Sequence, residues 1–207
     1  FNTVLSDHAL CGFGYLDEVS LNKVLRVFFV NVDQTISVSN IARENLILRS
    51  LINPKNTHTI PNGIDNTKFR PPGEEELEEI KKERIKNGKD NTITIVSVSR
   101  QAYRKGTDLL IEVIPEICKK YPNVNFIIGG DGPTQILLEI LLETSDLKEK
   151  DKLTGFLPHQ KVRDVMIQGQ IYLNTSITES FCIAIVEAAS AGLYTIATDV
   201  GGVGEVL

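Results

Sequence analysis

The fold class is decided by the stretch TITIVSVSRQAYRKGTDLLIEVIPEICKKYPNVNFII, which covers residues 92–128. A β-rich run over residues 92–99 is followed by a helical pattern over 106–120 and then by a second β-rich run over 124–128. Strands that alternate with helices of this length predict a parallel, doubly wound sheet. In such a sheet the ligand lies at the carboxyl ends of the strands, in the loops that follow them.

The same alternation continues on both sides of this stretch. The expected strands lie at residues 1–5, 35–38, 57–60, 152–154, 171–174 and 194–198, and the expected helices at 41–51, 134–144, 159–168 and 181–191. A charged stretch from 66 to 91 indicates a linker with one exposed helix. We therefore expect an α/β protein with two Rossmann-like domains. Residues 1–65 would be the C-terminal half of the first and residues 66–207 most of the second, with both ends of the chain cut.

Composition excludes several classes of protein. The formal net charge of -5 argues against a nucleic-acid binder, so any anionic ligand must be held locally. The three cysteines are far apart and form no C-x-x-C pair, which indicates neither a disulfide framework nor a zinc site and favours a reducing compartment. No uninterrupted apolar run approaches the ~20 residues of a spanning helix, so we expect the chain as given to be soluble.

Two cations lie in the loop after the first strand of the second domain. Arg100 and Lys105 are separated by five positions at the carboxyl end of that strand. Arginine presents a planar fork to phosphate oxygens and lysine a mobile point charge, so the pair suits a diphosphate whose charge develops as it leaves. The alternative is a solvated basic loop that caps a helix.

Three glycines, Gly129, Gly130 and Gly132, follow the next strand of this domain. Glycine lets the backbone approach a ligand or adopt a positive φ before a helix. An ordinary tight turn explains the segment equally well. It lacks the G-x-G-x-x-G spacing of a dinucleotide site, which weakens the alternative that the chain is a dehydrogenase.

Two glutamates flank the expected helix at 181–191. Along a helix Glu179 and Glu187 would be ~12 Å apart, too far to act on one bond as glycosidase carboxylates do. They could hold opposite ends of an elongated ligand, with the amides of Phe181, Cys182 and Ile183 facing a phosphate between them. Glu187 could instead be a surface residue, but most of this helix is apolar, and a carboxylate there needs a partner.

The histidines give weaker signals. His8 follows the opening strand, and taken alone it is best explained as a capping or hydrogen-bonded residue. His58 and His159 are interpreted as structural.

Taken together, the Arg100 and Lys105 loop, the turn at 129–133 and the two glutamates resemble the retaining glycosyltransferases of family four, which have the two-domain GT-B fold. The segment PNGID at 61–65 resembles the family's segment before the interdomain linker. Two positions depart from the family pattern. Thr134 stands where a basic residue is usual, which could loosen a ligand contact, and Gly204 stands where proline is usual, which softens a turn.

Within this family, the sequence is most similar to that of the enzymes that transfer N-acetylglucosamine to phosphatidylinositol. The similar segments are 6–13, 103–110, 126–130, 173–176 and 181–190. The resemblance implies UDP-N-acetylglucosamine as donor and phosphatidylinositol at a membrane surface as acceptor, in the first step of glycosylphosphatidylinositol anchor synthesis. It also implies other subunits of a transferase complex, at the cytosolic face of the endoplasmic reticulum membrane. No metal is expected, and no nucleic acid.

The same resemblance implies roles for individual residues. Arg100 and Lys105 would hold the diphosphate, Glu187 the ribose hydroxyls and Glu179 the sugar hydroxyls. His8 matches the family's histidine near the transferred sugar. The alternatives are another enzyme of the family that uses a UDP- or GDP-sugar, and a sugar-nucleotide-binding scaffold subunit without turnover.

Overall fold

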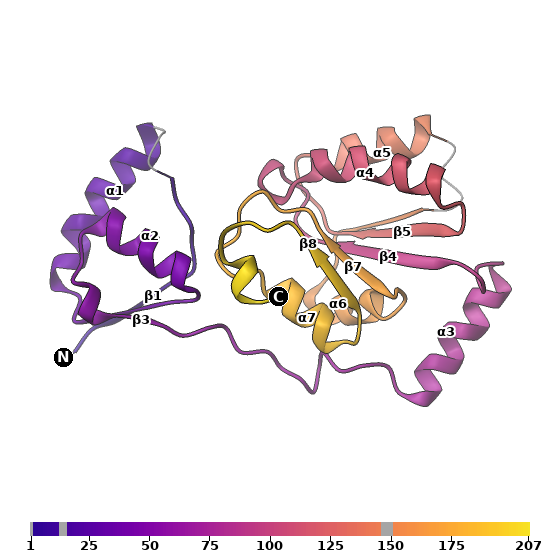
Figure 1. The fold of residues 1–207 in the computed structure, drawn as a ribbon, viewed down its shortest axis with the longest axis horizontal. Helices are drawn as coiled ribbons and strands as arrows, with labels where there is room; N and C mark the ends of the chain where they lie inside the picture. Colours follow the sequence, from indigo (N-terminus) through magenta and orange to yellow (C-terminus); the bar gives the residue numbers. More distant parts are fainter. Residues whose placement is uncertain (1, 13–15, 146–150) are drawn as a thin grey trace. The chain divides into compact units, whose positions relative to one another are not determined.

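The computed structural model describes residues 2–12, 16–145 and 151–207. They form two compact units (Figure 1). The first unit comprises Phe1–Gly63, Thr178–Ile183 and Asp199–Leu207, and the second comprises Ile64–Ile177 and Ala184–Thr198. The first unit is therefore completed by two short segments from the last thirty positions of the chain.

The first unit contains a three-stranded parallel sheet in the order β1-β2-β3, with strands Val4–Asp7, Gln34–Ser37 and Thr57–Thr59. The opening strand thus begins three residues later than expected. Its α-helices are α1 (Leu16–Phe28) and α2 (Asn40–Ser50), and short 3-10 turns are η1 (Phe29–Asn31), η2 (Pro54–Asn56) and η4 (Gly201–Glu205). Helix α1 was not predicted from the sequence.

Both ends of helix α2 have clear physical causes. Ser39 caps its start, since the side-chain oxygen accepts a hydrogen bond from the amide of Ala42 at 3.1 Å. The carboxylate of Glu205 accepts from the amides of Asn40 and Ile41 at 2.8 and 2.9 Å, where a negative charge complements the helix dipole. Leu51 ends the helix with a left-handed φ of 55°. A residue from the distant part of the chain therefore completes the cap.

The second unit confirms the predicted parallel, doubly wound sheet. Its strand order is β6-β5-β4-β7-β8, for strands Lys152–Gly155, Val124–Gly129, Ile93–Val98, Ile171–Asn174 and Tyr194–Ala197. Its helices are α3 (Glu74–Lys86), α4 (Thr107–Lys120), α5 (Gln135–Thr144), α6 (His159–Met166) and α7 (Ile183–Ser190), with the turn η3 (Tyr103–Lys105). Helices α4 and α5 lie on one face of the sheet and α6 and α7 on the other (Figure 1), as right-handed crossovers require.

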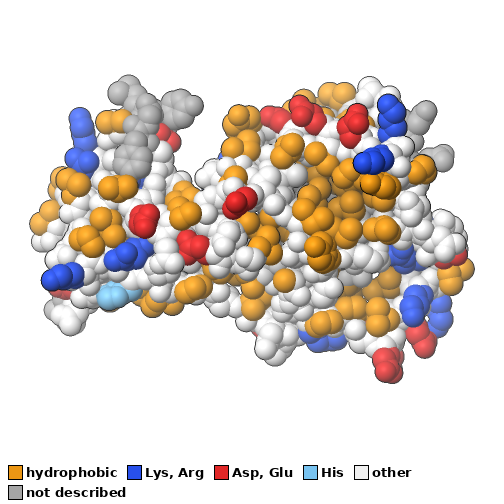
Figure 2. All heavy atoms as spheres, viewed as in Figure 1, with side chains coloured by type: hydrophobic (Ala, Val, Ile, Leu, Met, Phe, Trp, Pro, Cys, Tyr) orange, Lys and Arg blue, Asp and Glu red, His pale blue; other side chains and the backbone are white. Residues whose placement is uncertain are grey.

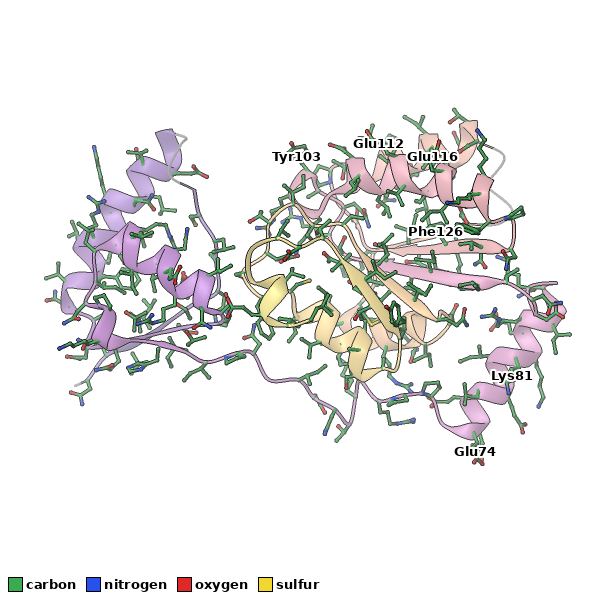
Figure 3. The ribbon with its side chains drawn as sticks, in the orientation of Figure 1. Glu74, Lys81, Tyr103, Glu112, Glu116 and Phe126 are labelled. Carbon is green, nitrogen blue, oxygen red and sulfur yellow. The ribbon has the colours of Figure 1, made fainter. Side chains whose placement is uncertain are left out.

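The core of the second unit lies between the sheet and helices α4 and α5. Ile114, Phe126 and Leu138 are fully buried in this cluster, one from each of α4, β5 and α5. Figure 3 shows Phe126 at the sheet, while Glu112 and Glu116 point outward from α4. The helical period of 3.6 residues separates these two faces of α4. This packing fixes the strand ends from which the loops of the site extend.

The outer surface of the second unit is mixed. Figure 2 shows hydrophobic side chains gathered over the middle of its visible face, with charged side chains along the margins. Strand β8 ends the sheet, and its Tyr194 and Ile196 are exposed. Within the described ranges, no helix has both the length and the apolar character that crossing a membrane requires.

Helix α3 is tied to the second unit through one carboxylate. Glu76 accepts two hydrogen bonds from the guanidinium of Arg163, at 2.8 and 3.0 Å, and one from Arg70 at 2.9 Å. Its Oε2 also accepts from the amide of Gly73 at 2.8 Å, which caps the helix. These contacts, with the Arg163 hydrogen bonds foremost, lower the pKa of Glu76 from 4.5 to about 2. The exposed helix expected within 66–91 is therefore anchored.

Glu76→Gln should lower the free energy of unfolding near neutral pH, and this loss should become smaller as the pH falls. Because the folded state holds the pKa of Glu76 below its unfolded value, its stabilising contribution is present above pH 4.5 and is lost as pH falls toward about 2. Urea midpoints of wild type and variant between pH 2.5 and 7 measure this. Glu75→Gln, an exposed neighbour in the same helix turn, is the control. A gap between wild type and Glu76→Gln that stays constant with pH would contradict the assignment.

Candidate nucleotide-binding site

The strand ends of the second unit form one pocket. It has a volume of about 470 Å³, and its walls come from the loops after β4, β5 and β6: Val98, Ser99, Arg100, Gly130, Asp131, Gly132, Phe156 and Leu157. Three of the residues singled out from the sequence, Arg100, Gly130 and Gly132, are therefore brought together. All strands are parallel, so these loops share one edge of the sheet. The sheet order reverses between β4 and β7, so the loop after β4, which carries Arg100, lies beside the point where a doubly wound sheet binds its ligand.

Phe156 and Leu157 were missed by sequence reasoning. They follow β6 just as Arg100 follows β4, and that position after a strand was the signal that could have found them. The side chain of Phe156 is exposed and Leu157 is partly buried. They give the pocket an apolar wall opposite the polar loops.

Glycine is required where two of these loops touch. Gly130 has a φ of +111°, and a Cβ there would lie 1.9 Å from the carbonyl oxygen of Ser99. A Cβ on Gly132 would lie 2.1 Å from the carbonyl oxygen of Gln101. The close approach of the loops after β4 and β5 therefore depends on both glycines.

Gln101 fastens the same two loops together. Its buried side-chain amide donates to the carbonyls of Ser99 and Gly129 at 3.2 and 3.1 Å. Its own amide donates to the carbonyl of Asp131 at 2.9 Å, and its carbonyl accepts from the amide of Thr134 at 3.2 Å. Sequence reasoning missed this residue, because a glutamine in a polar loop carries no signal of burial. Its contacts fix the loop backbone from which the side chain of Arg100 extends.

Lys105 ends the turn η3, and the loop after β7 holds it there. The hydroxyl of Thr175 donates to the carbonyls of Lys105 and Gly106, at 3.2 and 3.0 Å. Arg104 accepts from the amide of Ile177 at 2.9 Å through its carbonyl. The basic loop is thus fixed through its backbone.

Three side chains of this loop lie on the solvent side. Those of Arg100 and Arg104 are exposed, and so is Tyr103, which points outward in Figure 3. Of the two arginines, Arg100 lines the pocket, so its guanidinium group can meet a ligand that arrives from solvent.

Glu187 is buried on α7 and has the partner that the sequence required of it. Its Oε1 lies 3.1 Å from Nε2 of His159, the first residue of α6. Sequence reasoning interpreted His159 as structural and did not connect the two residues.

The expected helix start at Phe181 is wrong. Helix α7 begins at Ile183, and Cys182 before it has a positive φ of 63°, which a non-glycine residue seldom adopts. Phe181 and Cys182 therefore lie in a turn before the helix, and Glu179 lies in a loop. The helical spacing used for Glu179 and Glu187 does not apply, because Glu179 is not on the helix.

His8 and Glu179 belong to the first unit. The hydroxyl of Ser180 donates to the carbonyl of His8 at 2.7 Å, and Ser39 donates to the carbonyl of Ser180 at 2.5 Å. The ring of His8 contacts the hydroxyl of Ser6 at 2.8 Å. Glu179 is buried, and its carbonyl accepts from the amide of Gly202 at 2.9 Å. The segment around Ser180 is thus held between the end of β1 and the start of α2.

Asp7, the residue before His8, has a carboxyl group with a shifted pKa. Burial raises the pKa of Asp7 above its ordinary value, although the charge of Arg49 opposes the shift. Arg49 is itself buried and lies 3.4 Å from the Asp7 carboxylate. The pair supports the strand end that carries His8.

No cluster of three or more histidine, cysteine, aspartate or glutamate side chains suited to a metal ion occurs in residues 2–12, 16–145 and 151–207. All three cysteines are free thiols.

Parallel strands whose following loops gather at one edge of the sheet define a doubly wound α/β protein. The family model described as "Glycosyl transferases group 1" matches residues 78–207. The chain therefore belongs to the group 1 glycosyltransferases, and its fold is GT-B.

Curated relatives match almost the whole chain, and two of them come from Arabidopsis thaliana and Homo sapiens. A phosphatidylinositol N-acetylglucosaminyltransferase subunit of Arabidopsis thaliana is 45% identical over 207 residues, which are 100% of this chain and 44% of that protein. The Homo sapiens protein of the same name is 47% identical over 205 residues, or 99% of this chain and 40% of that protein. The chain thus spans less than half the length of these relatives.

A solved structure shows the same fold. Anabaena HepE in complex with UDP and glucose superimposes with a TM-score of 0.84 at 22% sequence identity, over 100% of this chain and 55% of that one. At this identity the likeness concerns the fold alone.

Proposed function

We propose that this chain is part of a retaining glycosyltransferase that moves N-acetylglucosamine from UDP-N-acetylglucosamine to phosphatidylinositol. The observation that carries the proposal is the identity of 45 and 47%, over essentially the whole chain, to relatives that bear the name of that activity. The pocket beside Arg100 supports it, because its glycine-lined loops and apolar wall suit a nucleotide diphosphate. The two domains would be residues 1–65 and 66–207.

The second domain would bind the donor. Arg100 and Lys105 neutralise the diphosphate as the bond between the anomeric carbon and the phosphate oxygen breaks. Glu187 accepts hydrogen bonds from the ribose hydroxyls. The backbone of Gly129, Gly130 and Gly132 leaves room for the nucleotide. Phe181 and Cys182 before α7, with Ile183 as its first residue, offer backbone amides.

Two residues would act on the sugar. His8 lies near the transferred sugar and Glu179 binds its hydroxyls. The acceptor oxygen attacks the anomeric carbon on the face that the diphosphate leaves, which retains the configuration. The hydroxyl proton passes to the departing phosphate oxygen, so UDP and the glycosylated lipid are the products. We propose that no metal takes part.

The chain would work within a larger assembly. The relatives are named as subunits, which supports a complex with other proteins. A lipid acceptor places the reaction at a membrane surface, which we propose to be the cytosolic face of the endoplasmic reticulum.

Calorimetric titration of the chain with UDP-N-acetylglucosamine, GDP-mannose and NAD tests the donor assignment. We expect binding of the UDP-sugar, unchanged by EDTA, and weaker or no binding of the other two. Preference for GDP-mannose would favour another member of the family, and binding of NAD alone would overturn the proposal. The acceptor is tested by transfer of labelled N-acetylglucosamine to phosphatidylinositol by the full-length protein in its complex. Donor binding without transfer would favour a scaffold role.

A further inference from the structure

The buried carboxylate of Glu187 depends on a side chain from another helix. The Glu187 side chain is 9% exposed and that of His159 is 64% exposed, with 3.1 Å between Oε1 and Nε2. Burying a carboxylate without a partner is costly, and such a group becomes protonated or turns away. His159 supplies the partner and engages Oε1.

A lysine fixes the tautomer of this histidine. The Nζ of Lys68 lies 2.6 Å from Nδ1 of His159, on the side of the ring away from Glu187. An ammonium group can only donate a hydrogen bond and a carboxylate can only accept one. Nδ1 must therefore accept from Lys68, and Nε2 must carry the proton that it donates to Glu187. The two neighbours therefore determine the tautomer of the ring.

Packing also fixes the position of the ring. The ring of His159 meets that of Phe69 edge-on, with centroids 5.6 Å apart and planes at 61°. Phe69 is buried, and its carbonyl accepts from the hydroxyl of Ser190 on α7 at 2.5 Å. The relay from Lys68 through His159 to Glu187 therefore joins the segment before α3 to the start of α6 and the body of α7.

We propose that His159, held by Lys68, positions Glu187 so that its other oxygen, Oε2, recognises the vicinal hydroxyls of the nucleotide ribose. The proposal rests on the donor site given under Proposed function and adds to it the residues that set ribose recognition. A carboxylate can accept from both hydroxyls of a diol, but only when its plane is held within a fraction of an ångström. His159 does not touch the ligand, so it is a positioning residue.

The test compares the affinities of UDP and 2′-deoxy-UDP, measured by calorimetry on the 207-residue chain. Wild type should bind UDP about tenfold more tightly, the effect of one hydrogen bond to a charged group. His159→Phe keeps the ring and its contact with Phe69 but removes the N–H, so it should lose most of this preference. His159→Gln restores a donor and should recover part of it. His58→Phe, which changes a histidine of the first unit that contacts Gln34, is the control.

The outcomes separate the inference from the proposed function. Failure of wild type to bind either nucleotide overturns the donor site itself. Tight binding of UDP by wild type with equal affinity for 2′-deoxy-UDP leaves the site in place but overturns the ribose inference. The same holds if His159→Phe keeps the full preference. If His159→Phe does not fold, Lys68→Met decides: a reduced preference supports the inference and an unchanged one overturns it.

Discussion

Lys105→Ala should lower the rate of sugar transfer by the full-length protein by about 10²–10³-fold, the loss that follows removal of one charge-stabilising donor from a transition state. Lys105 lies in the loop after β4, and the hydroxyl of Thr175 fixes its backbone by donating to its carbonyl. Charge develops on the diphosphate only as the bond breaks, so the turnover number should fall more than the donor affinity. Initial rates over a range of UDP-N-acetylglucosamine concentrations measure both quantities.

Arg104→Ala is the matched control for this experiment. It removes the same charge one residue away, from an exposed side chain whose backbone alone contributes to the loop. We expect transfer within about twofold of wild type, since surface substitutions away from a site have small effects. Equal losses in the two variants would mean that the loop supplies only a diffuse positive field, and Lys105 would then have no specific role.

Gly106→Ala should lower the free energy of unfolding by about 2–5 kcal/mol, the sum of a backbone cost and a packing cost. Gly106 has a φ of +68°, and a Cβ there would lie 1.7 Å from the carbonyl oxygen of Thr175. The left-handed backbone costs a non-glycine residue about 1–2 kcal/mol, and forcing atoms into a packed site costs about 1–3 kcal/mol more. Urea unfolding followed by circular dichroism measures the loss. The same variant should also weaken nucleotide binding, because the loop that carries Lys105 has to move.

Gly88→Ala separates the two causes. Gly88 has nearly the same φ, +66°, but no atom lies within 4 Å of a Cβ placed there. It should lose only the backbone term of about 1–2 kcal/mol. If Gly106→Ala lowers the free energy of unfolding by no more than Gly88→Ala does, the loop after β7 moves aside at no energetic cost. The close approach of Gly106 to Thr175 then does not constrain the site.

The sequence predicted the sheet of the second unit because short β-rich runs alternate there with longer helical patterns. The same reasoning placed Arg100 and Gly130 at one edge, since parallel strands send all their following loops to that edge. It did not find helix α1, where no loop motif or strand alternation marked the boundaries. The start of α7 was misplaced because Cys182 adopts a positive φ, which its residue type does not signal.

The details of the site depend on contacts that local patterns do not encode. Glu187 was expected to need a partner, but His159 is 28 positions away, and only the folded loops bring the two together. Gln101 is similar, since its burial arises from two loops closing over it. The burial of polar side chains by distant segments is a property of the tertiary structure. The sequence therefore predicted that Glu187 needs a partner but not that His159 is this partner.

The cap that Glu205 places on helix α2 affects the order in which the chain folds. Synthesis proceeds from the N-terminus, so residues 1–63 leave the ribosome long before Glu205, which lies 165 positions after Asn40. Until that segment emerges, α2 has only its Ser39 cap, and the turn around Ser180 is also missing. Contacts of such sequence separation slow folding, because a long loop must close before they form. The contacts of residues 1–63 are therefore completed only after residues 64–177 of the second unit have been translated, and a nascent-chain chaperone would find them unfinished while the second unit is already folding.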